Sequence, residues 1–234
     1  MNVAINGPEI LGYLFGNTSL PITETMRNSW IIMAFILFLC IRMEKIPKGK
    51  QALAEKAVLM IDGLVDSTMG EGCRAFSPYI MTLMMSSLFG SLASLFWMRS
   101  TTADLNTTLG WAIITFILIT YNKIKFGGIK GYLKGFLEPI FVMAPLNVLS
   151  EIATPVSMSF RHFGNMAGGL VITTLIMGAL KVLSNAVLGF LPVPLLQIGL
   201  PGVLSLYFDC FTACMQAFIF SMLTMAYVGD ARGS

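Results

Sequence analysis

Charged residues are scarce in this sequence. Asp, Glu, Lys and Arg together make up 12% of the 234 residues, about half the fraction of a typical soluble domain. The mean hydropathy is +0.77. A membrane-crossing helix needs about 20 apolar residues, and uncharged runs of that order lie between Arg74 and Arg99, between Asp104 and Lys123, and on either side of Asp209. The scarcity of charge disfavours a soluble domain and predicts an all-α polytopic membrane protein.

The sequence also lacks the motifs of nucleotide, metal and nucleophilic chemistry. It has one histidine, no phosphate-binding loop, no cluster of metal ligands and no nucleophile triad. Its four cysteines do not form a disulfide pattern, since Cys40, Cys210 and Cys214 fall in apolar helices and are interpreted as small packing residues. We expect no cofactor, no metal, no nucleic-acid partner and no catalytic activity of this chain alone.

Neither a signal peptide nor an internal repeat is recognisable in the sequence. The first 27 residues lack a basic n-region and contain Glu9 and Glu24, so we expect the first helix to be retained. The absence of a repeat argues against a transporter that is built from two duplicated halves.

The order of apolar and polar stretches predicts a single membrane domain over residues 1–234. Its expected parts are an external tail (1–27), a first span (28–43), an amphipathic interfacial helix (50–68), a transmembrane hairpin (77–122) and a long helix hairpin (136–229). From Pro145 to about Leu188 there is no strong turn cluster, and one helix of that length would measure roughly 65 Å. A perpendicular span needs only about 30 Å. This segment must therefore tilt steeply, break, or run partly along the membrane plane.

Basic residues predict the orientation of the chain. One group follows the first span, and the other follows the second helix of the transmembrane hairpin, whereas the tail and the loop at 99–106 contain few basic residues. The two groups are Arg42, Lys45, Lys48, Lys50 and Lys56, and Lys123, Lys125, Lys130 and Lys134. Loops rich in Lys and Arg stay in the cytoplasm. We expect the N-terminus outside and the C-terminus in the cytoplasm of a bacterial cell, at its inner membrane, with an organellar energy-coupling membrane as the alternative.

One arginine lies deep in the apolar region. Between Glu151 and Asp209 the only formal charges are Arg161 and Lys181. A guanidinium cannot lose its proton to avoid the cost of burial, and an ionisable group inside a membrane is by default a candidate functional site. Small and polar residues share a helix face with Arg161, namely Asn147, Glu151, Thr154, Ser157, Asn165 and Gly168. The alternative is that this polar stripe packs against neighbouring helices.

The last helix, expected at about 203–229, has polar residues of its own. Asp209 and Gln216 share one face of a regular helix. A carboxylate at this position can take up and release protons, and the alternative is a static ion pair with Arg161 or Lys181. The single histidine, His162, points about 100° away from Arg161 and is interpreted as a packing residue.

Three segments resemble motifs of one family. Residues 155–166 (PVSMSFRHFGNM) resemble the hallmark segment of subunit a of rotary F-type ATP synthases. Residues 102–108 (TADLNTT) are similar to its external-loop motif, and residues 216–224 (QAFIFSMLT) to its final-helix motif. The three occur in the family's order and are together highly specific. The first 70 residues match in pattern rather than in motif.

The resemblance implies a stator subunit that faces a ring of small c subunits, each with one carboxylate in the membrane. Two offset aqueous half-channels would carry ions, expected to be H⁺, to and from the ring and couple the ion gradient to rotation and ATP synthesis. The implied partners are the c-ring, peripheral stalk subunit b, the whole F-type ATP synthase complex and the lipid bilayer. The family's steeply tilted hairpin would explain the long segment at 136–229. A self-contained ion channel or secondary transporter is the alternative.

The resemblance also implies an ion path through seven residues, which are Arg161, Asp209, Asn165, Gln216, Glu151, Asn147 and Ser150. Arg161 matches the family's arginine and would separate the two half-channels. Asp209 and Asn165 would line the outer half-channel, and the cytoplasmic one is expected near Glu151.

Three further positions either support the resemblance or depart from it. Asp104 and Asn106 belong to the segment that matches the external-loop motif. Nine residues after the arginine, where many members of the family carry His or Glu, this chain has Leu170. This departure removes one partner of a proton relay across the two helices, and it predicts that Asp209 carries more of the relay by itself.

Overall fold

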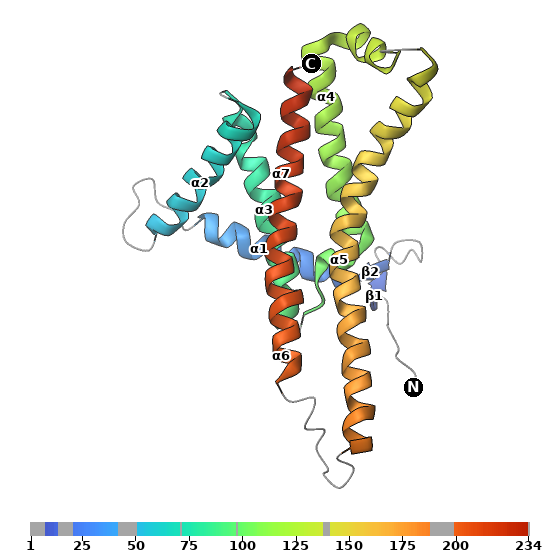
Figure 1. The fold of residues 1–234 in the computed structure, drawn as a ribbon. Helices are drawn as coiled ribbons and strands as arrows, with labels where there is room; N and C mark the ends of the chain where they lie inside the picture. Colours follow the sequence, from blue (N-terminus) through green and yellow to red (C-terminus); the bar gives the residue numbers. More distant parts are fainter. Residues whose placement is uncertain are drawn as a thin grey trace.

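The computed structural model describes residues 8–13, 21–41, 51–70, 72–96, 98–137, 141–187 and 199–233. Its helices are α1 (Glu24–Ile41), α2 (Gln51–Met69), α3 (Ser77–Leu92), α4 (Leu105–Leu137), α5 (Ala144–Val187), α6 (Leu200–Ser205) and α7 (Thr212–Gly233), with a π-helical segment, Leu206–Phe211, before α7 (Figure 1). Within these residues, five helical stretches are long and apolar enough to cross a membrane. The predicted all-α polytopic membrane protein is confirmed.

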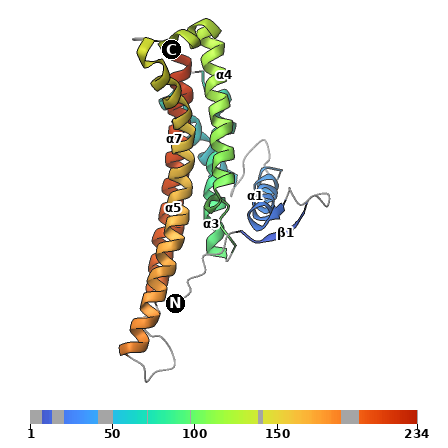
Figure 2. The ribbon, with the colours of Figure 1, turned by 90° about the vertical axis from the view of Figure 1, so that its right-hand side faces the viewer.

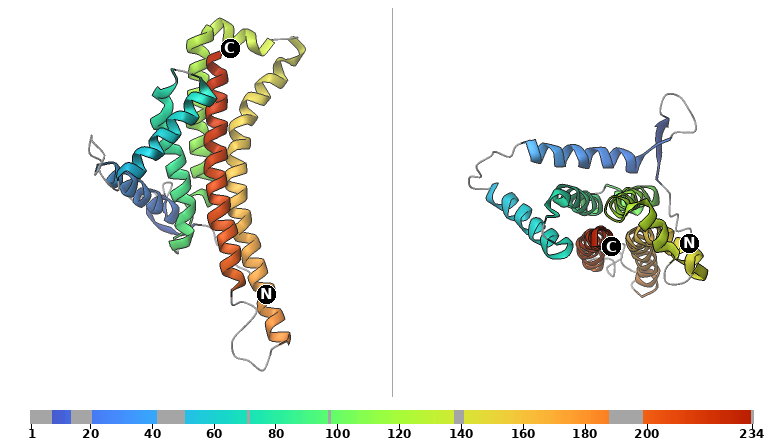
Figure 3. Two further views of the ribbon diagram at one scale, coloured as in Figure 1. Left: turned by 60° about the vertical axis from the view of Figure 1, so that its left-hand side comes forward. Right: turned by 90° about the horizontal axis from the view of Figure 1, so that it is seen from above.

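Four helices form the body of the molecule. α7 packs against α3, α4 and α5, and α4 packs along α5. Seen along the bundle, α5 and α7 lie in one layer, with α3 and α4 behind them (Figure 3). The lower end of α5 and the neighbouring α6 extend beyond the other helices (Figures 1 and 2). One broad face of the α5–α7 layer is therefore not covered by any other described helix.

α1 runs across the long axis of the bundle, beside α3 (Figures 1 and 3). It is fastened to the connection between α3 and α4, because the Thr25 hydroxyl donates to Asp104 Oδ2 at 2.8 Å and Asn28 Nδ2 donates to the Arg99 carbonyl at 3.0 Å. By length and composition α1 qualifies as a span. The first span at 28–43 and the other boundaries within the membrane domain stay predictions.

A short antiparallel ribbon precedes α1. β1 (Ile10–Tyr13) pairs with β2 (Pro21–Thr23), and the Glu24 amide donates to the Glu9 carbonyl at 2.9 Å. The predicted external tail therefore contains regular structure that the sequence analysis did not anticipate. The two strands have four and three residues, which is too short for an alternating apolar pattern to be recognised.

The turn from α4 to α5 begins with a kink at Gly128. This residue has a φ of 71° and a ψ of 161°, a combination that favours glycine because it has no Cβ. After the kink the chain continues as a helical arm to Leu137, which crosses over towards α5 (Figure 1). The glycine-rich connection at 126–135 is thus mostly helical. α5 then runs for 44 residues with Pro155 inside it, so the long segment does not break.

Two buried clusters hold the helices together. One joins α2, α3, α4 and α7, and it includes Ile61 and Val65 from the apolar face predicted for the amphipathic helix. The other joins α3, α4, α5 and α7 and consists of Leu83, Ala112, Met158 and Phe220. A hydrogen bond of 3.1 Å between the Thr108 and Ser159 hydroxyls links α4 to α5. Such small and hydroxyl-bearing residues let membrane helices approach closely.

Candidate functional site

The inner face of α5 packs into the bundle behind Arg161. Its buried residues are Met158, Ser159, His162, Met166 and Gly169. His162 is 1% exposed, and its Nε2 lies 3.2 Å from Ser87 Oγ. Its ring makes edge contacts with Trp111 and Phe220, at centroid separations of 6.1 and 5.6 Å. The histidine is therefore a core residue, which agrees with its interpretation as a packing residue.

The outer face of α5 carries Arg161. The exposed members of the polar stripe are Ser157, Arg161 and Asn165, and the half-buried ones are Asn147, Glu151, Thr154 and Gly168. In the part of the chain that the structure describes, neither Arg161 nor Lys181 has an ion-pair partner. The structure thus gives no support to a static pair between Asp209 and either cation. A cation that no described residue of its own chain compensates suits a partner that brings the negative charge.

Asp209 lies in the π-helical segment, next to α5. The Thr212 hydroxyl donates to the Tyr207 carbonyl five residues earlier, at 3.1 Å, which fits the wider turn. The sequence predicts one regular helix at about 203–229, and the structure differs because Leu206–Phe211 is π-helical. Because a π turn inserts an extra residue, the spacing of 100° per residue does not hold between Asp209 and Gln216. Asp209 is half-buried, whereas Gln216 is buried within the bundle.

Gly169 brings the π-helical segment close to α5. A Cβ atom added at Gly169 would lie 2.9 Å from Phe208 Cδ1, which is shorter than a van der Waals contact. Glycine is therefore the residue that fits between α5 and Phe208, the neighbour of Asp209. The adjacent Leu170 is 46% exposed, so it offers an apolar side chain on the outer face of α5.

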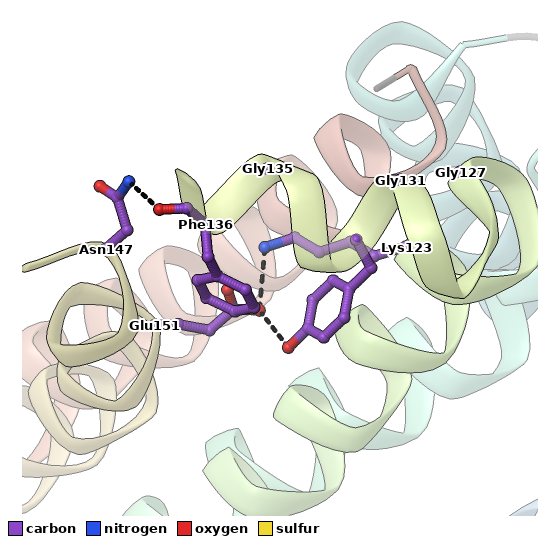
Figure 4. A pocket seen from close by; sticks show the side chains of 8 residues that line it. Lys123, Gly127, Gly131, Gly135, Phe136, Asn147 and Glu151 are labelled. Atoms are coloured by element: carbon purple, nitrogen blue, oxygen red, sulfur yellow. Dashed lines mark hydrogen bonds and ion pairs between the residues drawn. The ribbon is translucent and has the colours of Figure 1, made fainter. Parts of the chain in front are cut away.

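The clearest polar cluster lies at the other end of α5, under the arm of α4 (Figure 4). Glu151 Oε1 accepts from Lys123 Nζ at 3.0 Å and from the Tyr132 hydroxyl at 3.3 Å. Asn147 Nδ2 donates to the Phe136 carbonyl at 3.0 Å. The arm is therefore attached to the first turns of α5 at two points, and one of the attached residues is a carboxylate.

Two cavities adjoin this cluster. The first, of about 380 Å³, is lined by Lys123, Gly127, Gly131, Tyr132, Gly135, Phe136, Asn147 and Glu151. The second, of about 260 Å³, is lined by Phe116, Ile119, Lys123, Ser150, Glu151, Thr154, Tyr227 and Asp230. The structure thus brings Asn147, Ser150 and Glu151 together around spaces that are large enough for several water molecules. Several of the lining groups carry charge or hydrogen-bonding atoms, which such water needs.

The external-loop residues Asp104 and Asn106 have a structural role in the described chain. Asp104 Oδ1 accepts the Asn106 amide hydrogen at 3.0 Å at the start of α4, as a helix-capping carboxylate does. Its other oxygen accepts the hydroxyl of Thr25 from α1. Asp104 therefore joins the loop, α4 and α1.

Sequence reasoning missed Lys123 and Tyr132 as members of the site. Lys123 was assigned to a basic loop, and Tyr132 was not singled out. They lie 28 and 19 residues before Glu151, and only the antiparallel packing of α4 on α5 brings them to it. A lysine at the end of one apolar run and a glutamate at the start of the next was the available signal.

Comparisons with known proteins agree with this picture. The sequence model of a family described as "ATP synthase A chain" matches residues 26–229. The chain is 32% identical over 233 residues to "ATP synthase subunit a, sodium ion specific" of Propionigenium modestum, which covers 91% of this chain and 75% of the relative. It is 32% identical over 219 residues to "ATP synthase subunit a" of Moorella thermoacetica, covering 90% and 91%. It is 33% identical over 214 residues to the protein of that description in Desulforamulus reducens, covering 88% and 78%.

Proposed function

The chain belongs to the ATP synthase A chain family, and we propose how its surface passes ions to a rotating partner. Within the F-type complex it serves as the stator subunit of the membrane sector. The observation that carries the proposal is Arg161, an exposed cation on α5 that no described residue of its own chain neutralises. Its counter-charge is a carboxylate of the c-ring, which passes along the uncovered face of α5 and α7.

Arg161 acts as a barrier and as a transient partner. A ring carboxylate that has released its ion is negative, and the guanidinium attracts it. Because the guanidinium stays charged, it also repels a cation that would leak straight from one half-channel to the other. Each elementary charge that crosses 100 mV supplies ~2.3 kcal/mol, and the ring converts this energy into rotation.

The two half-channels lie on opposite sides of Arg161. The outer half-channel is lined by Asp209, Asn165 and Gln216. Asp209 takes up the ion there, because the sequence has no other carboxylate in the apolar region that leads to Gln216. Asn147, Ser150 and Glu151 serve the exit. The support for the exit is the pair of cavities around Glu151. Ten residues separate Glu151 from Arg161, which is about 15 Å along a helix.

The wider setting follows from the same assignment. The partners are the c-ring, peripheral stalk subunit b and the rest of the F-type complex, in a bacterial inner membrane. The N-terminus lies outside and the C-terminus lies in the cytoplasm, because the basic loops stay inside. The ring side of the molecule is the α5–α7 layer, and the transported ion is H⁺.

The decisive test replaces Arg161 in the whole complex. Arg161→Ala should abolish ATP synthesis and ATP-driven ion pumping in inverted membrane vesicles, while the subunit still copurifies with the ring. Lys181→Ala is the matched control, because Lys181 is another exposed cation of α5 without an ion pair among the described residues, and it should keep most of the transport. Pumping is measured with H⁺ and with Na⁺. A pumping Arg161→Ala complex would overturn the proposal.

A further inference from the structure

The ion pair of Lys123 and Glu151 is unusual in this chain for its burial. The side chains are 33% and 14% exposed, whereas the other two ion pairs of the described residues each include an arginine that is 47% or 70% exposed. Exposed pairs contribute little to stability. A pair withdrawn from water is different, since removing one partner leaves an uncompensated charge. The Lys123 ammonium therefore compensates the charge of the Glu151 carboxylate.

The pair also has a particular place, because Lys123 and Glu151 line both cavities, the first of which is drawn in Figure 4. On one side are Tyr132 and Asn147, and on the other is Asp230 of α7. Lys123 and Tyr132 from α4 contact the Glu151 carboxylate, and Asp230 from α7 lines the second cavity together with it. The Lys123–Glu151 pair is therefore shared by the two cavities.

We propose that Lys123 is a positioning residue for ion release, acting through Glu151 as a tethered cation that competes with the transported one. This inference rests on the proposed function. An ion that leaves the ring binds the Glu151 carboxylate and displaces the ammonium. The ammonium then repels the bound ion and returns to the carboxylate as the ion departs to water. Lys123 keeps its own proton throughout, so the only transfer is the ion's passage onto and off the carboxylate.

The first experiment compares three variants of the whole complex in inverted vesicles. Lys123→Gln should lower ATP synthesis and passive ion flux towards the cytoplasmic face by about tenfold, because the ion leaves past Glu151 in that direction and an adjacent positive charge favours the ionised carboxylate by about that factor. Lys123→Arg should restore most of the flux. Lys125→Gln removes the same charge two residues along, from an exposed side chain that lies over the rings of Tyr121 and Phe126, and it should leave flux unchanged. Normal flux in Lys123→Gln would overturn the proposal.

A second readout separates ion release from a purely structural role. Without the ammonium, Glu151 holds the ion longer, so the flux of Lys123→Gln towards the cytoplasmic face should recover, relative to the unmodified complex, when the ion is made scarcer on that release side. This means a higher pH there for H⁺, or less Na⁺ for Na⁺. The same change on the opposite side should not restore the flux. Recovery that is equal from both sides, or absent from both, would contradict a role in release.

A double variant tests whether Lys123 acts through Glu151. Glu151→Gln should impair transport, and adding Lys123→Gln should cause no further loss, since coupled residues are not additive. If the losses of flux in the two single variants add up in the double variant, the proposal is overturned. The proposal is also overturned if the Lys123→Gln chain does not copurify with the ring while the double variant does. If Glu151→Gln alone transports normally while Arg161→Ala does not, the exit proposed above is wrong. An impaired Glu151→Gln with a normal Lys123→Gln refutes only the role of Lys123.

Discussion

Two neighbouring polar residues of one helix differ in their exposure to the surroundings of the protein. Arg161 and His162 are adjacent in sequence, yet Arg161 is exposed on the outer face of α5 and His162 is 1% exposed in the core. Successive residues of a helix point about 100° apart. The histidine is accommodated by Ser87 and two aromatic rings. In the function that we propose, the arginine keeps its charge for a partner, and this explains why its cost inside the membrane is tolerated.

At the same scale, Asp209 should be needed for its ability to release a proton. Asp209→Asn keeps the size of the side chain but cannot bind and release H⁺, so we expect ATP-driven pumping to fall at least about tenfold. Asp209→Glu retains a carboxylate and should preserve a measurable part of the flux. Both are measured in vesicles with equal amounts of assembled complex. Unchanged pumping in Asp209→Asn would remove this residue from the path.

At the scale of elements, two departures from regular α-helix determine where the polar groups lie. The kink at Gly128 turns the arm of α4 over α5, which puts Tyr132 above Glu151. The π-helical segment changes the rotation of the chain between Asp209 and α7. Such segments occur often at functional sites. Both departures lie next to the groups that we assign to the ion path, one beside the first turns of α5 and one beside its middle.

The contact between Gly169 and the π-helical segment gives a test at this scale. Gly169→Val should force Phe208 away from α5, because even a Cβ would lie 2.9 Å from its ring. Overpacking of this kind costs about 1–3 kcal/mol, so the thermal unfolding midpoint of the detergent-solubilised complex and the ion flux should both fall. Adding Phe208→Ala should restore part of the stability. Gly110→Ala is the control, since nothing lies within 4 Å of a Cβ there.

The whole molecule is asymmetric. α1, α3 and α4 lie on one side, and α5 and α7 leave one broad face uncovered by other described helices (Figure 3). That face carries exposed Arg161 and Asn165 together with large apolar side chains, which include Phe160, Leu170 and Phe218. A lone channel or transporter would need to shield its charged path from lipid by itself. An open face with a charge suits a subunit whose path is completed by another.

Reconstitution distinguishes the stator from its rivals. The purified chain alone in liposomes should pass no H⁺ or Na⁺ under an applied potential of about 100 mV, and conductance should arise when the c-ring and subunit b are added. The Arg161→Ala chain in the same assembly is the control for uncoupled leak. Selective flux through the chain alone would favour a self-contained channel or secondary transporter. A chain whose Arg161 affects assembly only would be a scaffold.

Some features could be predicted from the sequence because they depend on local spacing. The scarcity of charge and the length of the apolar runs determine that the chain enters a membrane. The interval of three or four residues separates the face of Arg161 from that of His162. The strands at 10–13 and 21–23 were missed because they are short. The π-helical turn was missed because its residues have the same apolar composition as an α-helix.

The sequence by itself determined the class of protein, the placement of Arg161 and His162 on different faces of one helix, and the segments that carry the family's motifs. Only the tertiary structure decided that Lys123 and Tyr132 meet Glu151, that Phe208 fits against Gly169, and that the face of Arg161 is left uncovered. The physical reason is distance along the chain. Periodicity fixes which residues share a helix face, but contacts between helices depend on kinks, glycines and packing that no single helix specifies.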